Sequence, residues 1–315
     1  MQQYLDEWNF LVAESYSAPL PDALRAACGE KGNVGALVER SLPGATTTSA
    51  AAQSVCDAIS LCVIPFGATL RMDGPLNVGA LLVRGTLVWD DATQAGAAEQ
   101  WLCAGYVAVE AAGTMMVSLP SSSHSAFLYL KNNGAVHGGG LGRRALGAVG
   151  GGRIELRGRA LGRAWSLLAE APAAGASQLA LIHDPEQMGW RVGDRIVVAP
   201  TGREAREDAH PTTVTGFAPG NVVLLGAPLP RALSWEFRAH EGTLALLTAE
   251  VINLSRNVLV TGDDFTHEAC GSGAVDSTKI CTYGLHTAAR DAGSVMVAEH
   301  VRLERCGQRG VSGKH

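Results

Sequence analysis

Short apolar runs closed by glycine recur from about residue 55 onward, and they constrain the fold more than any other feature. Residues 80–83, 86–89 and 114–118 are examples, and Gly85 and Gly113 lie at their boundaries. Within several runs the apolar residues alternate with a period of two, which is typical of strands and not of helices. Glycine between strands permits turns that need a positive φ. The pattern therefore predicts an all-β protein: a sandwich, a barrel or a β-solenoid.

The distribution of these runs favours a solenoid of stacked parallel strands. The runs persist to the end of the sequence, and no series of Asn-Gly or Asp-Gly hairpin turns joins them, with Asn133–Gly134 the main candidate. Each coil of a solenoid buries its apolar face against the neighbouring coil. Short apolar runs late in the chain fit such strands, at 250–254, 258–261, 295–298 and 301–304. Two β-sandwiches remain the alternative.

Changes in composition and hydrophobic periodicity predict three parts along the chain. Residues 1–54 form an N-terminal segment with helical spacing over 20–37 and a small, polar linker over 41–51. Residues 55–168 and 169–315 carry the β pattern. Over 180–230 the pattern of turns and strands differs, and it predicts a small barrel-like insertion. The glycine-rich run at 138–144 lacks the Gly-Lys-Ser/Thr ending of a phosphate loop, and it reads as a mobile loop.

Charge and hydropathy exclude several classes of function. The net charge is −5 and no basic stripe is present, which argues against a nucleic-acid partner. No apolar run reaches the roughly 18 residues of a membrane span, so attachment to a membrane is expected only through segments absent from this chain. The start of the sequence does not read as a signal peptide. The protein is therefore expected to be cytosolic, or the sequence to lack its true start.

A set of ordered motifs resembles the G8 domain family, which is named for its recurrent glycines. The motifs are VIPFG at 63–67, LLVRGTLVWD at 81–90, GRIELRG at 152–158, WSLL at 165–168, WRVGDRIVV at 190–198 and AEVINLSRNV at 249–258. The last is the sharpest match. The family includes a cell-migration-inducing hyaluronan-binding protein, its transmembrane relative and the fibrocystins.

The resemblance implies a G8 domain over 55–168 that continues into a right-handed parallel β-helix over 169–315, in a secreted or cell-surface protein. It implies binding, and in some members depolymerisation, of an acidic polysaccharide of hyaluronan type. Any enzymatic activity would then be glycosidase-type and belong to the full-length parent. The alternative is a non-catalytic structural, adhesion or receptor protein like the fibrocystins. Family members continue past a Gly-Gln pair like Gly307–Gln308 with a His-x-His strand that is absent here, so this chain is expected to be a fragment.

Arg256 and Asn257 are the candidate ligand-binding residues. A guanidinium matches the carboxylate of an acidic glycan in shape and charge. The alternative is structural, because an asparagine at a β-helix corner can hydrogen-bond the backbone of the neighbouring coil.

Asp263, Asp264 and His286 are the candidate catalytic residues. Adjacent carboxylates in an extended chain point apart, whereas a glycosidase pair must face the scissile bond across about 5–9.5 Å. The two aspartates are also weak candidates for a Ca²⁺ site, the one cofactor the sequence suggests; a solvated turn is the alternative. Asp276 and Asp291 are further possible acidic partners, and His267, His300 and His315 lie near His286 in sequence.

Cysteine usage leaves two interpretations open. Cys270 and Cys281 flank a loop that contains glycine and serine and can form a disulfide in an oxidising compartment. Otherwise the seven cysteines are small buried apolar side chains.

Overall fold

The protein contains two compact units built from interleaved stretches of chain. The computed structural model describes residues 20–29, 32–94, 96, 98–121, 123–201, 210–240, 243–263, 266–269 and 280–307. Unit 1 contains Ala160–Ser255, and unit 2 combines Pro19–Arg159 with Arg256–His315. Unit 1 is therefore an insertion within the sequence of unit 2.

Unit 2 contains, in its described residues, three sheets whose strands pair in parallel, here named A, B and C. Sheet A has the order β1 (Val38–Ser41), β3 (Ser60–Ile64), β6 (Ala80–Val83), β9 (Val107–Val109), β12 (Ala145–Ala148), β25 (His286–Ala289). Sheet B has the order β2 (Thr46–Thr48), β4 (Thr69–Arg71), β7 (Thr86–Asp90), β10 (Thr114–Ser118), β13 (Arg153–Arg157), β26 (Val295–Glu299). Sheet C has the order β5 (Leu76–Asn77), β8 (Glu99–Ala104), β11 (Ser125–Leu130), β22 (Val258–Gly262), β27 (Val301–Leu303).

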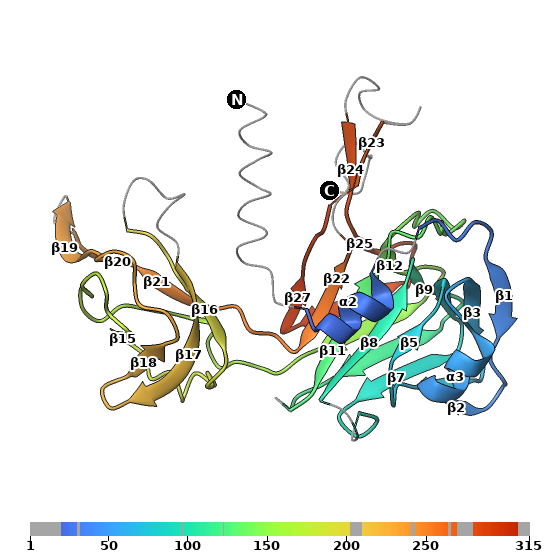
Figure 1. Cartoon of the computed structure of the whole chain (residues 1–315), viewed down its shortest axis with the longest axis horizontal. Coiled ribbons are helices and arrows are strands. Elements are labelled where there is room, and N and C mark those ends of the chain that lie inside the picture. The colour runs from blue at the N-terminus through green and yellow to red at the C-terminus, as the bar shows by residue number, and fades with distance from the viewer. Residues whose placement is uncertain are drawn as a thin grey trace. The chain divides into compact units, whose positions relative to one another are not determined.

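The chain visits these sheets in a fixed order. It runs from β6 in sheet A to β7 in sheet B and β8 in sheet C, and then repeats the path through β9, β10 and β11. Figure 1 labels β7, β8, β9 and β11 of this path. We call one passage through A, B and C a round. Each strand pairs with the strand of the preceding round, so every round shields the apolar face of its neighbour.

Three of the recurrent glycines, Gly85, Gly113 and Gly152, lie at the corner between sheets A and B. A Cβ at Gly113 would collide with the carbonyl of Val83, and a Cβ at Gly152 would collide with the carbonyl of Val109 in the preceding round. Glycine is required here because the backbones of successive rounds approach so closely. One such glycine therefore occurs in each of these three rounds.

Apolar side chains stack in register through the interior of unit 2. In sheet B, Leu70 pairs with Leu87, Leu87 with Met115, and Met115 with Ile154. All four side chains are fully buried. Burial of each such side chain contributes about 1.5–3 kcal/mol to folding, so the stack stabilises the pairing of successive rounds.

Unit 1 is an antiparallel sheet with its own core, inserted between β13 of sheet B and β22 of sheet C. Its strand order is β14 (Trp165–Leu167), β21 (Glu250–Asn253), β16 (Arg195–Val198), β17 (His210–Ala218), β18 (Val222–Leu225), β15 (Gln178–Ala180). A hairpin of β19 (Trp235–His240) and β20 (Thr243–Thr248) belongs to it. Leu168, Trp190, Ile196 and Val251 are buried in its core. The sequence placed the start of this insertion later, near residue 180.

The N-terminal part of unit 2 departs from the expected linker. Helix α2 (Asp22–Cys28) lies within the region of helical spacing, as expected. The expected linker over 41–51 is wrong, because its residues contribute to β2 and to helix α3 (Ser49–Val55). The Thr48 hydroxyl accepts a hydrogen bond from the Ala51 amide and caps α3. Small polar residues that resemble a linker therefore supply a helix cap and a close-packed face.

The expected all-β class is confirmed, with mostly parallel pairing in unit 2. The three-part division at 54 and 168 stays a prediction about domains. The run at 138–144, expected to be a mobile loop, packs in part within unit 2, because Leu141 and Arg144 are each 1% exposed. Its mobility stays a prediction. A further antiparallel pair, β23 (Thr266–Ala269) and β24 (Ile280–Tyr283), lies between β22 and β25 in the sequence.

Candidate functional site

The candidate residues from the sequence fall at opposite ends of one strand. Asn257 precedes β22, at the corner between sheets B and C, whereas Asp263 follows β22, at the corner between sheets C and A. Six residues of extended chain span about 20 Å. The two corners are therefore separate places, and the structure does not bring Arg256 and Asn257 together with Asp263.

Asn257 is buried, and backbone groups surround its carboxamide. Its Oδ1 accepts a hydrogen bond from the Arg159 amide at 2.7 Å. Its Nδ2 faces the carbonyl oxygens of Leu119 and Ser121 at 2.8 Å and of His124 at 3.0 Å. Asn257 thus links its own round to the preceding one, and it joins the two stretches of unit 2 that flank the insertion.

A histidine–aspartate pair lies beside Asn257 and was missed from the sequence. The Asp91 carboxylate is 2.8 Å from Nδ1 of His124, and it also accepts a hydrogen bond from the Ser121 amide. His124 is 18% exposed and Asp91 28%. The two residues are 33 positions apart in the sequence, and only the stacking of successive rounds brings them together. Arg256 is half-buried at the same corner.

Asp263 is 6% exposed, and its polar atoms are used within unit 2. The Tyr129 hydroxyl donates to its Oδ1 at 2.6 Å, and the Asn132 amide donates to its Oδ2 at 2.5 Å. The Arg144 guanidinium donates to its backbone carbonyl. Arg305, from the next round, donates to the carbonyl of the residue before it at 2.9 Å. These contacts connect three successive rounds.

Replacing Tyr129 with phenylalanine is expected to lower the free energy of unfolding by about 2 kcal/mol. The phenol donates to a carboxylate, and hydrogen bonds to charged groups contribute about 1.5–3 kcal/mol. Burial, and next the hydrogen bond to Asp263, raise the pKa of Tyr129, so the donor stays protonated through the physiological range. Urea denaturation of the two proteins at pH 7 measures the difference. An unchanged midpoint and slope would show that the bond contributes nothing.

His286 opens β25 near the same corner. Its side chain is 8% exposed and its amide donates to the Arg144 carbonyl at 3.0 Å. Asp263 and His286 therefore both contact Arg144 through backbone groups. Asp291 lies elsewhere, between β25 and β26, and accepts a hydrogen bond from the Gly150 amide.

Several candidates lie outside the described residues. These are Asp264, Asp276 and His315, the side chain of His267, and the expected disulfide between Cys270 and Cys281. The roles predicted for them stay predictions. His300 is described, and it occupies a turn position with φ 57° between β26 and β27. Among the described residues, no group of three or more His, Cys, Asp or Glu side chains is arranged to hold a metal ion.

Two disulfides join buried cysteines within the described part of unit 2. Cys28 of α2 bonds to Cys103 of β8, with Cα atoms 5.5 Å apart, and Cys56 after α3 bonds to Cys62 of β3, with Cα atoms 5.6 Å apart. The interpretation of all cysteines as small apolar side chains is therefore wrong for these four. Sequence gives no signal for a bond across 75 positions, because it depends on which strand α2 covers.

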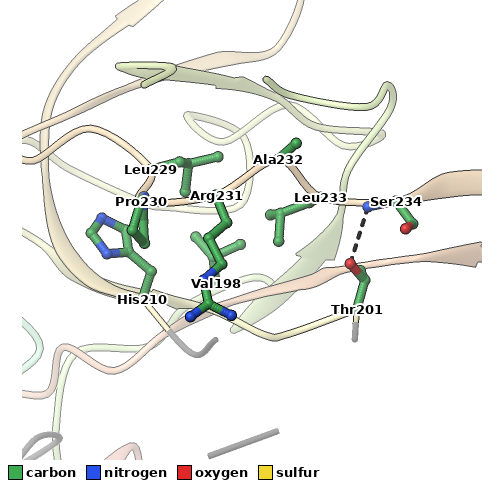
Figure 2. A pocket seen from close by; sticks show the side chains of 9 residues that line it. All are labelled: Val198, Thr201, His210, Leu229, Pro230, Arg231, Ala232, Leu233 and Ser234. Atoms are coloured by element: carbon green, nitrogen blue, oxygen red, sulfur yellow. Dashed lines mark hydrogen bonds between the residues drawn. The ribbon is translucent and has the colours of Figure 1, made fainter. Parts of the chain in front are cut away.

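Unit 1 contains a small open pocket of about 180 Å³. Figure 2 shows Arg231 extending between His210 on one side and Thr201 on the other. Leu229 and Leu233, both buried, form part of its apolar lining. An exposed guanidinium beside apolar surface can pair with a carboxylate or sulfate while the rest of a ligand covers the apolar side chains.

Comparison with known proteins gives one group of relatives. No family model matches the chain. It is 31% identical over 215 residues to human fibrocystin-L, a match that covers 65% of this chain. It is 28% identical over 213 residues to the mouse fibrocystin-L. The chain spans about 5% of the length of these curated relatives. No helix in the described part of the chain has the length and apolar character needed to cross a bilayer. Over about two-thirds of its length, this chain is therefore related to fibrocystin-L.

Proposed function

We propose that this chain is a non-catalytic structural, adhesion or receptor segment of a fibrocystin-like protein. The observation that carries the proposal is the use of Asn257, whose carboxamide is enclosed by backbone groups of its own unit. Asp263 is used in the same way. A general acid or a ligand-binding group needs polar atoms that reach the ligand, and here these atoms contact the protein backbone and Tyr129.

An extracellular setting forms part of the proposal. Disulfides persist in oxidising compartments and are rare in the cytosol. The Cys28–Cys103 and Cys56–Cys62 bonds support a secreted or cell-surface location, and so does the similarity to fibrocystin-L.

The finer description of the fold is also a proposal. We infer that unit 2 is a right-handed parallel β-helix that begins with a G8 domain. The ordered passage through sheets A, B and C supports it. Crossover connections between parallel strands of one sheet are right-handed in about 98% of cases, and this supports the handedness.

The test of a non-catalytic role is incubation of the protein with hyaluronan and other uronic-acid polymers, with and without Ca²⁺. The expected result is that polymer length stays constant for the wild type, Asp263→Asn and His286→Ala. Shortening of the polymer by the wild type, lost in either variant without a change in melting temperature, would contradict the proposal.

Binding of an acidic polysaccharide of hyaluronan type is the second candidate, and the pocket of unit 1 favours it. Retention on an immobilised hyaluronan column that falls at least tenfold in Arg231→Ala would support this candidate. Arg256→Ala is the matched control, because Arg256 lies in unit 2. The structural proposal expects no retention of any of the three proteins.

A further inference from the structure

Residues 135–144, between β11 and β12, form a lid over the outer face of sheet A. Ala135 and Leu141 of the lid are buried against Val63, Leu82 and Ala108 of that sheet. This apolar cluster is separate from the interior core of unit 2. The outer face of sheet A is therefore apolar, and the lid shields it from water.

The lid is fitted to the sheet at specific positions. A Cβ at Gly147 of β12 would collide with the Leu141 side chain, so the leucine rests directly on the backbone of the strand. A Cβ at Gly139 would meet the His137 ring. The amide of His137 donates to the Gly142 carbonyl at 3.0 Å, which closes the lid on itself. Arg290, which follows β25, reaches the Gly139 carbonyl at 3.4 Å.

His137 is the titratable group at the centre of the lid. Its side chain is 8% exposed, and its ring packs edge-on against Tyr106 with centroids 5.3 Å apart. Its Nε2 is 3.7 Å from Oε2 of Glu110, a distance too long for a hydrogen bond. Its Nδ1 is buried and has no hydrogen-bond partner among the described residues. Arg84 contacts the same Glu110 at 2.8 Å, which places positive charge beside that carboxylate.

These surroundings disfavour the charged imidazolium. A protonated imidazole carries two N–H donors, and here one would be buried without an acceptor. Burial lowers the pKa of His137 below its ordinary value, and the Glu110 carboxylate offsets only part of this effect. Burial raises the pKa of Tyr106, which therefore adds no charge near neutral pH.

We propose that the lid is an acid-sensitive cover, which opens when His137 is protonated and exposes the apolar outer face of sheet A. The groups that face His137 are Glu110, Tyr106 and, through Glu110, Arg84. Arg290 holds the neighbouring carbonyl, and the Arg144 guanidinium points to Asp263 instead. Of these groups, only the Glu110 carboxylate favours a protonated His137 in the closed lid and so opposes opening at low pH. Its ion pair with Arg84 weakens this attraction.

The direction of the pH dependence follows from linkage. The open lid has a histidine with an ordinary pKa near 6.5, whereas the closed lid has a lower one. The open form therefore binds the proton more tightly, and closure weakens as pH falls through 6.5. Between pH 7.5 and 5.5 the opening equilibrium is expected to increase by up to about tenfold.

Hydrogen–deuterium exchange of peptides from 133–144 tests the proposal on the full chain, with rates divided by the intrinsic exchange rate at each pH. The expected result is an increase approaching tenfold in the lid between pH 7.5 and 5.5, with no comparable change in β10 or β13. In His137→Phe the ring still packs on Tyr106 but does not titrate, so the pH response is expected to disappear. His124→Phe is the matched control at another corner, and it should keep the response.

Glu110→Gln provides an arm that does not depend on the folding of His137→Phe. Removal of the carboxylate removes the group that favours the imidazolium in the closed lid, so the increase in opening between pH 7.5 and 5.5 should be at least as large as in the wild type. The proposal would be overturned if the corrected exchange of the lid peptides in the wild type were equal or slower at pH 5.5 than at pH 7.5. A full pH response in His137→Phe would also overturn it, as would a response in Glu110→Gln smaller than that of the wild type.

Discussion

Replacing Asn257 with alanine is expected to lower the free energy of unfolding of unit 2 by about 4 kcal/mol. The substitution leaves the Arg159 amide and the carbonyls of Leu119, Ser121 and His124 without their partner. Each buried polar group left unsatisfied costs about 1–3 kcal/mol, and partial access to water reduces the sum. Urea denaturation monitored by circular dichroism measures this loss.

Asn257→Asp separates the structural role from a ligand-binding role. The aspartate keeps the acceptor for the Arg159 amide but turns a second oxygen toward three carbonyl oxygens, so its expected loss is at least as large as that of alanine. Arg256→Ala, one residue away, is the control, with an expected loss below about 1 kcal/mol because its side chain is only half-buried. Asn257→Ala with wild-type stability and lost glycan retention would instead identify a ligand-binding residue.

Removing the Cys28–Cys103 disulfide by a double alanine substitution is expected to lower the free energy of unfolding by about 4 kcal/mol. Removing Cys56–Cys62 in the same way should lower it by about 2 kcal/mol. The first bond closes a loop of 75 residues and the second a loop of 6, and a longer loop constrains the unfolded chain more. Denaturation of the two variants and the wild type under oxidising conditions gives both values.

The ranking of the two disulfides is the informative outcome. Cys28–Cys103 also fixes α2 on sheet C, where Asn77 donates to the Ala27 carbonyl at 2.6 Å. The control is denaturation of the wild type in the presence of a reductant, which breaks both disulfides. Its free energy of unfolding should be lower than that of either variant. A smaller loss for Cys28–Cys103 than for Cys56–Cys62 would contradict the docking of α2 on β8.

The sequence was sufficient to predict most strands and corners of unit 2, because the local signals there are strong, but not β2 and α3 within the expected linker. Period-two alternation in runs such as 114–118 marks strands, and glycines such as Gly113 mark corners, since both depend on the chain within a few residues. Stacking of these strands in parallel was also predictable, because no hairpin turns connect them.

Long-range pairing was not predictable, because it depends on geometry that no local pattern records. The insertion separates β13 from β22, although the two strands are consecutive in the path of unit 2. The Asp91–His124 pair exists only because successive rounds align. For Asn257 the contacts in the structure match the structural alternative that the sequence left open, and a role in binding a ligand stays a prediction.

The interleaved organisation of unit 2 is the central claim, and native-state hydrogen exchange across a guanidinium chloride series tests it most directly. The account predicts that β13 and β22 lose protection together, with one free energy and one denaturant dependence, although about a hundred residues separate them. Strands β16 and β17 of the insertion should exchange as a different cooperative unit. If β22 instead opened together with β16 and β17, while β13 remained protected, two stretches of sequence would not form one folding unit and the account would be wrong.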